Sequence, residues 1–112
     1  MQQPEPGNKV IVGWLSLNAG AEQAFDAITT KYLEDCRAEP ECRFYEMIRT
    51  REDPLTVLVC ECFDSEAAHE VHLQRPHVQA FFKVLSKIAG LGRFQNMVVA
   101  KVTPDSADFS TM

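Results

Sequence analysis

The sequence predicts an α+β fold in which helices cover one face of an antiparallel sheet. Three observations support this prediction. Short stretches are rich in β-branched and aromatic residues, other stretches carry apolar residues at helical spacing, and the two kinds alternate in a definite order. That order is strand, helix, strand, strand, helix, strand. It is typical of the ferredoxin-like βαββαβ arrangement.

The first strand is expected over residues 9–17 (KVIVGWLSL), and it stops at an Asn-Ala-Gly turn. A helix should then run from Ala21 to about Arg37, because its apolar residues recur at helical spacing. The dipeptide Glu39-Pro40 ends it, since a proline disfavours helical geometry in the residue before it.

Residues 43–51 and 55–63 are expected to form an antiparallel hairpin, because both alternate and a Glu-Asp-Pro turn joins them. In the second strand the period of two places four residues on one face and three on the other. These are Val57, Val59, Glu61 and Phe63, against Leu58, Cys60 and Cys62. Both faces are mostly apolar. Since the helices can cover only one face, we expect a second subunit to cover the other.

The second helical region is expected in two parts. Ser65 is suited to cap a helix that runs to about Gln74. Pro76 restarts the helix, because proline is favoured at a first helical position, and this part should end near Gly90. Residues 93–102 (RFQNMVVAKV) give the last strand.

The length and charge limit the classes of function. A chain of 112 residues with 46% hydrophobic content is expected to form one domain, over residues 8–103. Polar, proline-bearing tails at 1–7 and 104–112 are expected to be disordered. The net charge of −5 argues against nucleic acid and anionic membranes as partners. Without a long apolar run or a secretion signal, the chain is expected to be cytoplasmic.

Cysteine spacing and nucleotide motifs give no cofactor site. The four cysteines, Cys36, Cys42, Cys60 and Cys62, lack the paired spacing of zinc knuckles and are expected to be free thiols. Cys60 and Cys62 share the strand face that is expected at the interface with a second subunit. There is also no P-loop, Rossmann fingerprint or serine-nucleophile elbow, so no nucleotide cofactor is expected.

Three histidines, His69, His72 and His77, lie within nine positions of an amphipathic stretch. They could be metal ligands, proton shuttles, or structural residues, with His69 solvated at the surface. Glu61 is the most informative residue, because it interrupts an apolar strand. It could pair with a neighbouring helix, or it could serve chemistry in a cavity that places it close to His72 or His77.

Aromatic residues fall on most of the predicted elements. Several could form the wall of a pocket for a flat aromatic ligand, and the candidates for substrate contact are Trp14, Tyr45, Phe63 and Phe81. Packing in the core is the alternative reading for each of them.

Four segments of the chain resemble the antibiotic biosynthesis monooxygenase family of dimeric α/β barrels. They are RAEPECRFYE (37–46), ECF (61–63), DSEAAHEVHLQ (64–74) and RPHVQAFF (75–82). The resemblance implies a homodimer with one pocket per subunit between sheet and helices. It also implies oxidation of a small phenol, quinol or anthrone by molecular oxygen, without flavin, metal or haem.

Carried over by position, the resemblance implies roles for individual residues. His72 and His77 match the paired histidines of the family, one of them acting as base, and Glu61 matches the strand acid that orients it. Tyr45 matches the strand tyrosine, and Phe63 stands where tryptophan is frequent. Haem-degrading relatives need an asparagine and a histidine where Gly13 and Phe82 align, so haem oxygenation is not expected.

Two other classes of function stay open at this stage. Relatives on this scaffold include isomerases or lyases of small carbonyl compounds, which use similar proton-moving groups without oxygen. A dimeric binding or stress-response module is also compatible with the fold, because one scaffold carries many functions.

Overall fold

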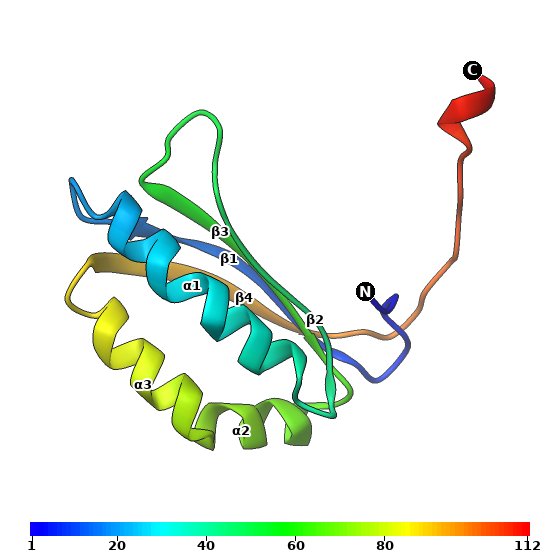
Figure 1. Cartoon of the computed structure of the whole chain (residues 1–112). Coiled ribbons are helices and arrows are strands. Elements are labelled where there is room, and N and C mark those ends of the chain that lie inside the picture. Colours follow the sequence, from blue (N-terminus) through cyan, green and yellow to red (C-terminus); the bar gives the residue numbers. More distant parts are fainter.

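The computed structural model describes all residues, 1–112, and contains one four-stranded antiparallel sheet with the helices on one side of it (Figure 1). The elements are β1 (Lys9–Leu17), α1 (Glu22–Arg37), β2 (Cys42–Arg49), β3 (Thr56–Phe63), α2 (Glu66–Gln74), α3 (Pro76–Leu85) and β4 (Ala89–Val98), followed by a 3-10 turn at Phe109–Thr111. The strand order β2-β3-β1-β4 is that of the predicted ferredoxin-like fold, which is thereby confirmed.

The register of the sheet brings four pocket-side residues into one row. Ile11 on β1 lies opposite Glu61 on β3 and Asn96 on β4, and Glu61 in turn lies opposite Tyr45 on β2. Because paired residues share a face, all four side chains project toward the helices. The core on this side includes the buried rings of Phe25, Tyr32, Phe63 and Phe81.

The other face of the sheet has no helix over it (Figure 1). Trp14 and Leu58 are paired in register there, with Ile48 next to Leu58 on β2. All three side chains are exposed, Trp14 by 52% and Ile48 by 54%. The predicted two-faced apolar strand is therefore present, and its outer face is uncovered in the single chain.

The predicted end of the last helix and the predicted bounds of the last strand are wrong. The last helix ends at Leu85 rather than near Gly90, and the last strand is Ala89–Val98 rather than 93–102. Pairing with β1 decides this, because Leu17 lies opposite Ala89 and Lys9 opposite Val98. The long-range ladder therefore outweighs the local signal of a glycine that is typical of a helix end.

The junction between α2 and α3 sets the direction of the histidines. Ser65 caps α2, its Oγ accepting a hydrogen bond of 3.0 Å from the backbone N–H of Ala68. Arg75 is extended, with φ −69° and ψ 141°, as expected for a residue before proline, and Pro76 starts α3. As a result His72 occupies the last turn of one helix and His77 the first turn of the next.

Both terminal segments leave the same end of the sheet in Figure 1, where the C-terminal segment extends away from the body, while the N-terminal segment contacts it. Gln3 accepts a hydrogen bond of 2.7 Å through its carbonyl from Arg43, and the backbone N–H of Gly7 donates one of 2.8 Å to Val99. Disorder of residues 1–7 and 104–112 stays a prediction. None of the helices has the length and apolarity that crossing a bilayer requires.

Candidate functional site

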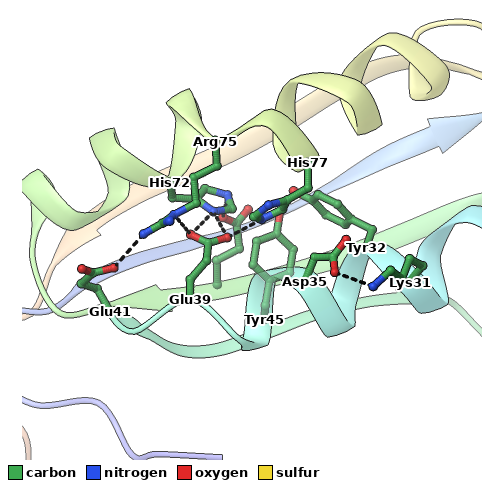
Figure 2. Close-up of polar contacts among 10 residues, drawn as sticks. Lys31, Tyr32, Asp35, Glu39, Glu41, Tyr45, His72, Arg75 and His77 are labelled. Carbon is green, nitrogen blue, oxygen red and sulfur yellow. Dashed lines mark hydrogen bonds and ion pairs between the residues drawn. The ribbon is translucent and has the colours of Figure 1, made fainter.

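A buried carboxylate, Glu39, organises the polar groups at the base of the helices (Figure 2). Nδ1 of His72 lies 3.0 Å from both of its oxygens. Nε2 of His77 lies 2.7 Å from Oε2, and Nε of Arg75 lies 3.0 Å from Oε1. Arg75 also donates a hydrogen bond of 3.2 Å to Glu41. A buried charge is expensive unless it is paired, and three basic groups meet this requirement for Glu39.

His72 stands between two carboxyl groups. Its ring is 1% exposed; Nδ1 faces Glu39, and Nε2 lies 3.9 Å from Oε1 of Glu61. A ring nitrogen that faces a carboxylate carries the proton and donates it, which leaves Nε2 as the acceptor toward Glu61. Burial lowers the pKa of His72 below its ordinary value, against the raising effect of Glu39, so the ring is mainly neutral at pH 7.

Glu61 is the only carboxyl group in the wall of a mainly apolar cavity. Burial raises its pKa to about 7, with the neighbouring charge of Glu39 acting in the same direction and a hydrogen bond from Tyr45 acting against it. At neutral pH this group is therefore divided between acid and carboxylate. That is the condition in which a carboxyl group can both take and give a proton.

The cavity lies between the sheet and α3 and has a volume of about 360 Å³. Its apolar wall includes Ile11, Leu15, Met47, Val59, Phe82 and Phe94. Its polar groups are Tyr45, Glu61, His69, Ser86 and Asn96. An apolar cavity with a few converging polar groups and a carboxyl of displaced pKa is the usual form of a small-molecule site.

His69 belongs to this wall and is not a surface residue. The structural reading of the sequence, which placed it in solvent, is wrong, because the side chain is 9% exposed and its ring packs near Phe63 with 5.4 Å between centroids. Its Nδ1 is buried and has no hydrogen-bond partner in the protein. Burial lowers its pKa, so it is a neutral ring with one free polar atom beside the cavity.

Two hydrogen-bonded tyrosines, Tyr45 in the cavity wall and Tyr32 behind it, support the site. The hydroxyls of Tyr32 and Tyr45 are 2.9 Å apart, and their rings meet edge to face. Burial raises the pKa of both well above the ordinary value, so both remain neutral phenols that can donate a hydrogen bond. Tyr45 lines the cavity, whereas Tyr32 supports it from α1.

Position 13 has room only for a glycine, because the backbone of β4 and the ring of Phe94 fill the space that a side chain would take. A Cβ at this position would lie 2.1 Å from the backbone oxygen of Arg93 and 2.8 Å from the ring of Phe94. The ring occupies the space above the glycine and forms part of the cavity wall. An asparagine here, as in the haem-degrading pattern, would need a shift of the backbone.

The structure brings together some of the predicted site residues and separates others. Glu61, His72, His77 and Tyr45 converge, but of these only Glu61 and Tyr45 line the cavity. Phe63 is buried behind it against His72, with 4.6 Å between ring centroids, and Phe81 stacks on Tyr32 at 3.7 Å. These two rings support the site from outside the cavity wall.

Trp14 is the candidate that the structure separates from the site. Its pairing with Leu58 puts it on the outer face of the sheet, away from the cavity. The sequence could have predicted this position, because alternate residues of a strand point to opposite faces. Ile11 and Leu15 share one face, and Trp14 lies on the other.

Sequence reasoning missed Glu39 and Arg75 as members of the site. Both had a sufficient local explanation, since Glu39 precedes a helix-ending proline and Arg75 precedes a helix-starting one. The sequence did contain one signal for them. Glu39-Pro40 and Arg75-Pro76 are two charged residues of opposite sign, each placed before a proline at a helix end, so the two could pair if these helix ends meet.

One group of side chains has the composition of a metal site. The ligand atoms of Cys36, Glu39 and His77 lie within 4.8 Å of one another. However, burial raises the pKa of the Cys36 thiol, and metal binding requires the thiolate. The Glu39 carboxylate is also engaged by Arg75 and His72. This donor set fits a protein hydrogen-bond network better than a resident metal.

Comparison with solved structures finds the same fold in several proteins of low sequence identity. A protein of Shewanella oneidensis is 23% identical with a TM-score of 0.75, covering 85% of this chain and 93% of that one. A protein of Deinococcus radiodurans, provisionally named an antibiotic biosynthesis monooxygenase, is 18% identical with a TM-score of 0.80, covering 88% and 99%. One of Nitrosomonas europaea with the same provisional name is 13% identical, with a TM-score of 0.77 and coverage of 93% and 99%.

The fold and the site define a class of small ferredoxin-like proteins with one apolar pocket between sheet and helices. Within this class, the family model of antibiotic biosynthesis monooxygenases matches residues 10–84, which is more than half of the chain. The protein belongs to that family, and the resemblance found in the sequence is confirmed. No curated protein matches it.

Proposed function

We propose that this protein is a cofactor-independent monooxygenase that oxidises a small phenol, quinol or anthrone with molecular oxygen. The observation that carries the proposal is the position of Glu61. It is a carboxyl group with a pKa of about 7 in the wall of an apolar cavity, with an imidazole directly behind it. Family membership and the provisional names of the neighbouring structures agree with an oxygenase.

The cavity suits a flat, mostly apolar ligand with one or two polar groups. Phe82 and Phe94 supply aromatic surface, while Tyr45, His69 and Asn96 offer polar atoms at separate points of the wall. The free Nδ1 of His69 is a ready partner for a hydroxyl or carbonyl of the ligand. A ligand of this kind would satisfy a polar atom that the protein leaves unpaired.

In the proposed reaction Glu61 takes a proton from the bound substrate. The resulting electron-rich anion transfers electrons to oxygen, and a carbon–oxygen bond forms. For an anthrone, a CH2 group and O2 become a carbonyl group and water: two C–H bonds break, and the four electrons lost by carbon reduce O2. The contribution of the protein is to remove the proton and to stabilise the anion with neutral donors.

This assignment gives the carboxyl group, rather than an imidazole, the contact with substrate. Glu61 lines the cavity, whereas His72 lies behind it and His77 lies beyond Glu39. His72 is then a positioning residue that receives the proton from Glu61. The sequence had suggested the opposite division of roles, with a histidine as base and Glu61 orienting it.

A homodimer is part of the proposal. The outer face of the sheet exposes Trp14, Ile48 and Leu58, and no element of the chain covers them. Two such faces packed against each other would bury this apolar surface, as in a sheet-on-sheet barrel.

The proposal is tested by measuring oxygen uptake of chelator-treated protein with a panel of dihydroxyarenes and anthrones. We expect protein-dependent uptake with at least one member, one oxygen atom incorporated into the product per O2 consumed with the other released as water, and no stimulation by added metal or flavin. The matched pair of variants is Glu61→Gln, which keeps the shape of the wall, and Glu46→Gln, which changes a carboxyl outside it.

Loss of uptake in Glu61→Gln but not in Glu46→Gln would support the proposal. Turnover of a substrate under argon at the aerobic rate would instead assign the site to the isomerase or lyase class. Binding of panel members without turnover of any kind would assign it to the class of ligand-binding modules.

A further inference from the structure

We propose that Glu61, His72, Glu39 and His77 form a proton relay that connects the floor of the cavity with a groove on the opposite side of α3. The inference deepens the proposed function and rests on it for its role in turnover. Its geometry is independent of that function. Each group in the series is within 4 Å of the next, and the exposed fraction of the side chain rises from 1% at His72 through 4% at Glu39 to 25% at His77.

The inner half of the relay is His72 and the two carboxyl groups beside it. Oε1 of Glu61 lies 3.9 Å from Nε2 of His72, and both oxygens of Glu39 lie 3.0 Å from Nδ1. The first distance exceeds a hydrogen bond, and a movement of about 1 Å by the Glu61 side chain closes it. The imidazole therefore presents an accepting nitrogen to one carboxyl and a donating nitrogen to the other.

The outer half of the relay leads to solvent. Oε2 of Glu39 lies 2.7 Å from Nε2 of His77, whose side chain is 25% exposed compared with 4% for Glu39. His77 lines a shallow groove between α1 and α3 together with Tyr32, Asp35 and Phe81. Figure 2 shows the ion pair of Lys31 and Asp35 beside this end of the relay.

The charges around the relay favour the passage of one proton at a time. Arg75, 3.0 Å from Glu39, is a permanent cation that balances the carboxylate when both histidines are neutral. A proton that enters then makes the cluster positive by one charge, and a second is opposed by the first and by Arg75. The titratable or charged groups that face the relay are Tyr32, Asp35 and Cys36 from α1, Tyr45 from β2, His69 from α2, and Arg75 between α2 and α3.

The reason for a relay is that a ligand in the cavity covers Glu61. The carboxyl group then has no direct path to bulk water, yet it must lose its proton before it can accept one from the substrate. In the outward direction Nε2 of His72 takes a proton from Glu61, and Nδ1 releases one to Glu39. Oε2 of Glu39, which lies 3.0 Å from this Nδ1 and 2.7 Å from Nε2 of His77, takes the proton. It passes the proton to Nε2 of His77 once that ring, which is 25% exposed, has exchanged with water to the tautomer that carries its own proton on Nδ1. In the return direction the same path delivers a proton to the peroxide that the substrate anion forms with O2. The hydroperoxide then loses water to leave the carbonyl group, and His72 regains its starting tautomer.

The relay can be tested without any substrate. In protein labelled with 15N-histidine, the exchange of the His72 Nδ1–H proton with water is measured by NMR in the Glu61→Gln background, where the cavity end cannot carry protons. We expect the exchange to slow at least tenfold when His77→Gln is added, because the amide can hold Glu39 but does not titrate. Adding His69→Gln instead, one turn earlier on α2, should leave the exchange rate unchanged.

A rescue experiment separates proton transfer from packing. In Glu61→Gln with His77→Ala, added imidazole should enter the groove and restore exchange, with thermal melts confirming that each variant is folded. Equal exchange rates with and without His77 would overturn the relay. The relay would also be overturned if exchange slows in the His77→Ala variant and added imidazole does not restore it.

The outcome for the relay is distinguishable from the outcome for the proposed function. Absence of oxygen uptake in the wild type would contradict the monooxygenase, while the exchange measurement would still decide the relay. If uptake is observed, His77→Gln should lower kcat about tenfold with little change in KM, and imidazole should restore His77→Ala. If His77→Gln changes neither kcat nor the exchange rate, the relay is contradicted, whereas the assignment as a monooxygenase is retained.

Discussion

Both oxygens of Glu39 lie 3.0 Å from Nδ1 of His72, although 33 positions separate the two residues in the chain. Glu39 follows the end of α1, and His72 lies in the last turn of α2, so the contact fixes the junction of three helices to the edge of the sheet. The same contact determines which nitrogen of His72 faces Glu61. Structure and proposed chemistry therefore share one hydrogen-bonded pair.

Removing the Glu39 carboxylate should destabilise the fold strongly. Glu39→Ala leaves Arg75 and two imidazoles without their buried partner, and breaking such a pair costs about 3–5 kcal/mol of the free energy of unfolding. The control is Glu46→Ala, which removes a more exposed ion pair with Arg37 and should cost about 1 kcal/mol or less. Urea unfolding of the two variants checks the difference, and equal losses would contradict a special role for Glu39.

Glu61 should make the free energy of unfolding fall as pH rises, which is the opposite of the usual effect of a carboxyl group. Its pKa rises from 4.5 to about 7 on folding, so between these values the folded chain holds a proton that the unfolded chain has released. The free energy of unfolding therefore falls as pH rises through this window, by about 3 kcal/mol at 1.36 kcal/mol per pKa unit. Glu61→Gln removes this contribution, so its stability relative to wild type should increase between pH 4.5 and pH 8.

Urea unfolding at several pH values measures this effect. Glu46→Gln is the matched control, because its side chain lies outside the cavity, and it should follow the pH dependence of the wild type. A Glu61→Gln variant whose pH dependence is parallel to that of the wild type would show that Glu61 titrates normally in the folded protein.

The outer face of the sheet should control association. Leu58→Glu places a charge at the centre of the exposed apolar row formed with Trp14 and Ile48, and we expect it to convert a dimer to a monomer. Val71→Glu, at a similarly exposed apolar residue on α2, should leave the dimer intact. Sedimentation velocity of both variants and the wild type provides the measurement, and a monomeric wild type would contradict the proposed assembly.

Gly13 should tolerate no side chain. Gly13→Ala brings a Cβ within 2.1 Å of the backbone oxygen of Arg93, which cannot move without disturbing the ladder between β1 and β4, so a loss of about 2–3 kcal/mol is expected. Gly90→Ala is the control, because no atom lies within 4 Å of its Cβ. Thermal melts of both variants test this, and similar melting temperatures would mean that the backbone of β4 can shift enough to admit a Cβ at Gly13.

The fold was predictable because local and long-range signals agree in most elements. The β-branched run of β1, the Ser65 cap and the Pro76 start each specify their element without help from the rest of the chain. The end of α3 was not predictable in this way. Its boundary depends on the register of β4 against β1, which is a long-range property.

The site was predictable only in part, for a similar reason. Glu61 stood out because a carboxyl group in an apolar strand is costly unless it has a purpose. Glu39 did not stand out, because a glutamate before a proline at a helix end is ordinary in sequence. Its importance arises from the convergence of Arg75, His72 and His77 in three dimensions. Burial of His69 likewise follows from packing against Phe63 and not from its neighbours in the chain.

The pH dependence of oxygen uptake tests the central claim most directly. With a substrate that the wild type turns over, kcat/KM should rise with pH through an apparent pKa of about 7, as Glu61 becomes the carboxylate that takes the proton. In Glu61→Gln the rate should fall at least a hundredfold, and the rise near pH 7 should disappear. A Glu61→Gln protein that keeps the wild-type rate and the same pH profile would contradict Glu61 as the base, and with it the function proposed for this cavity.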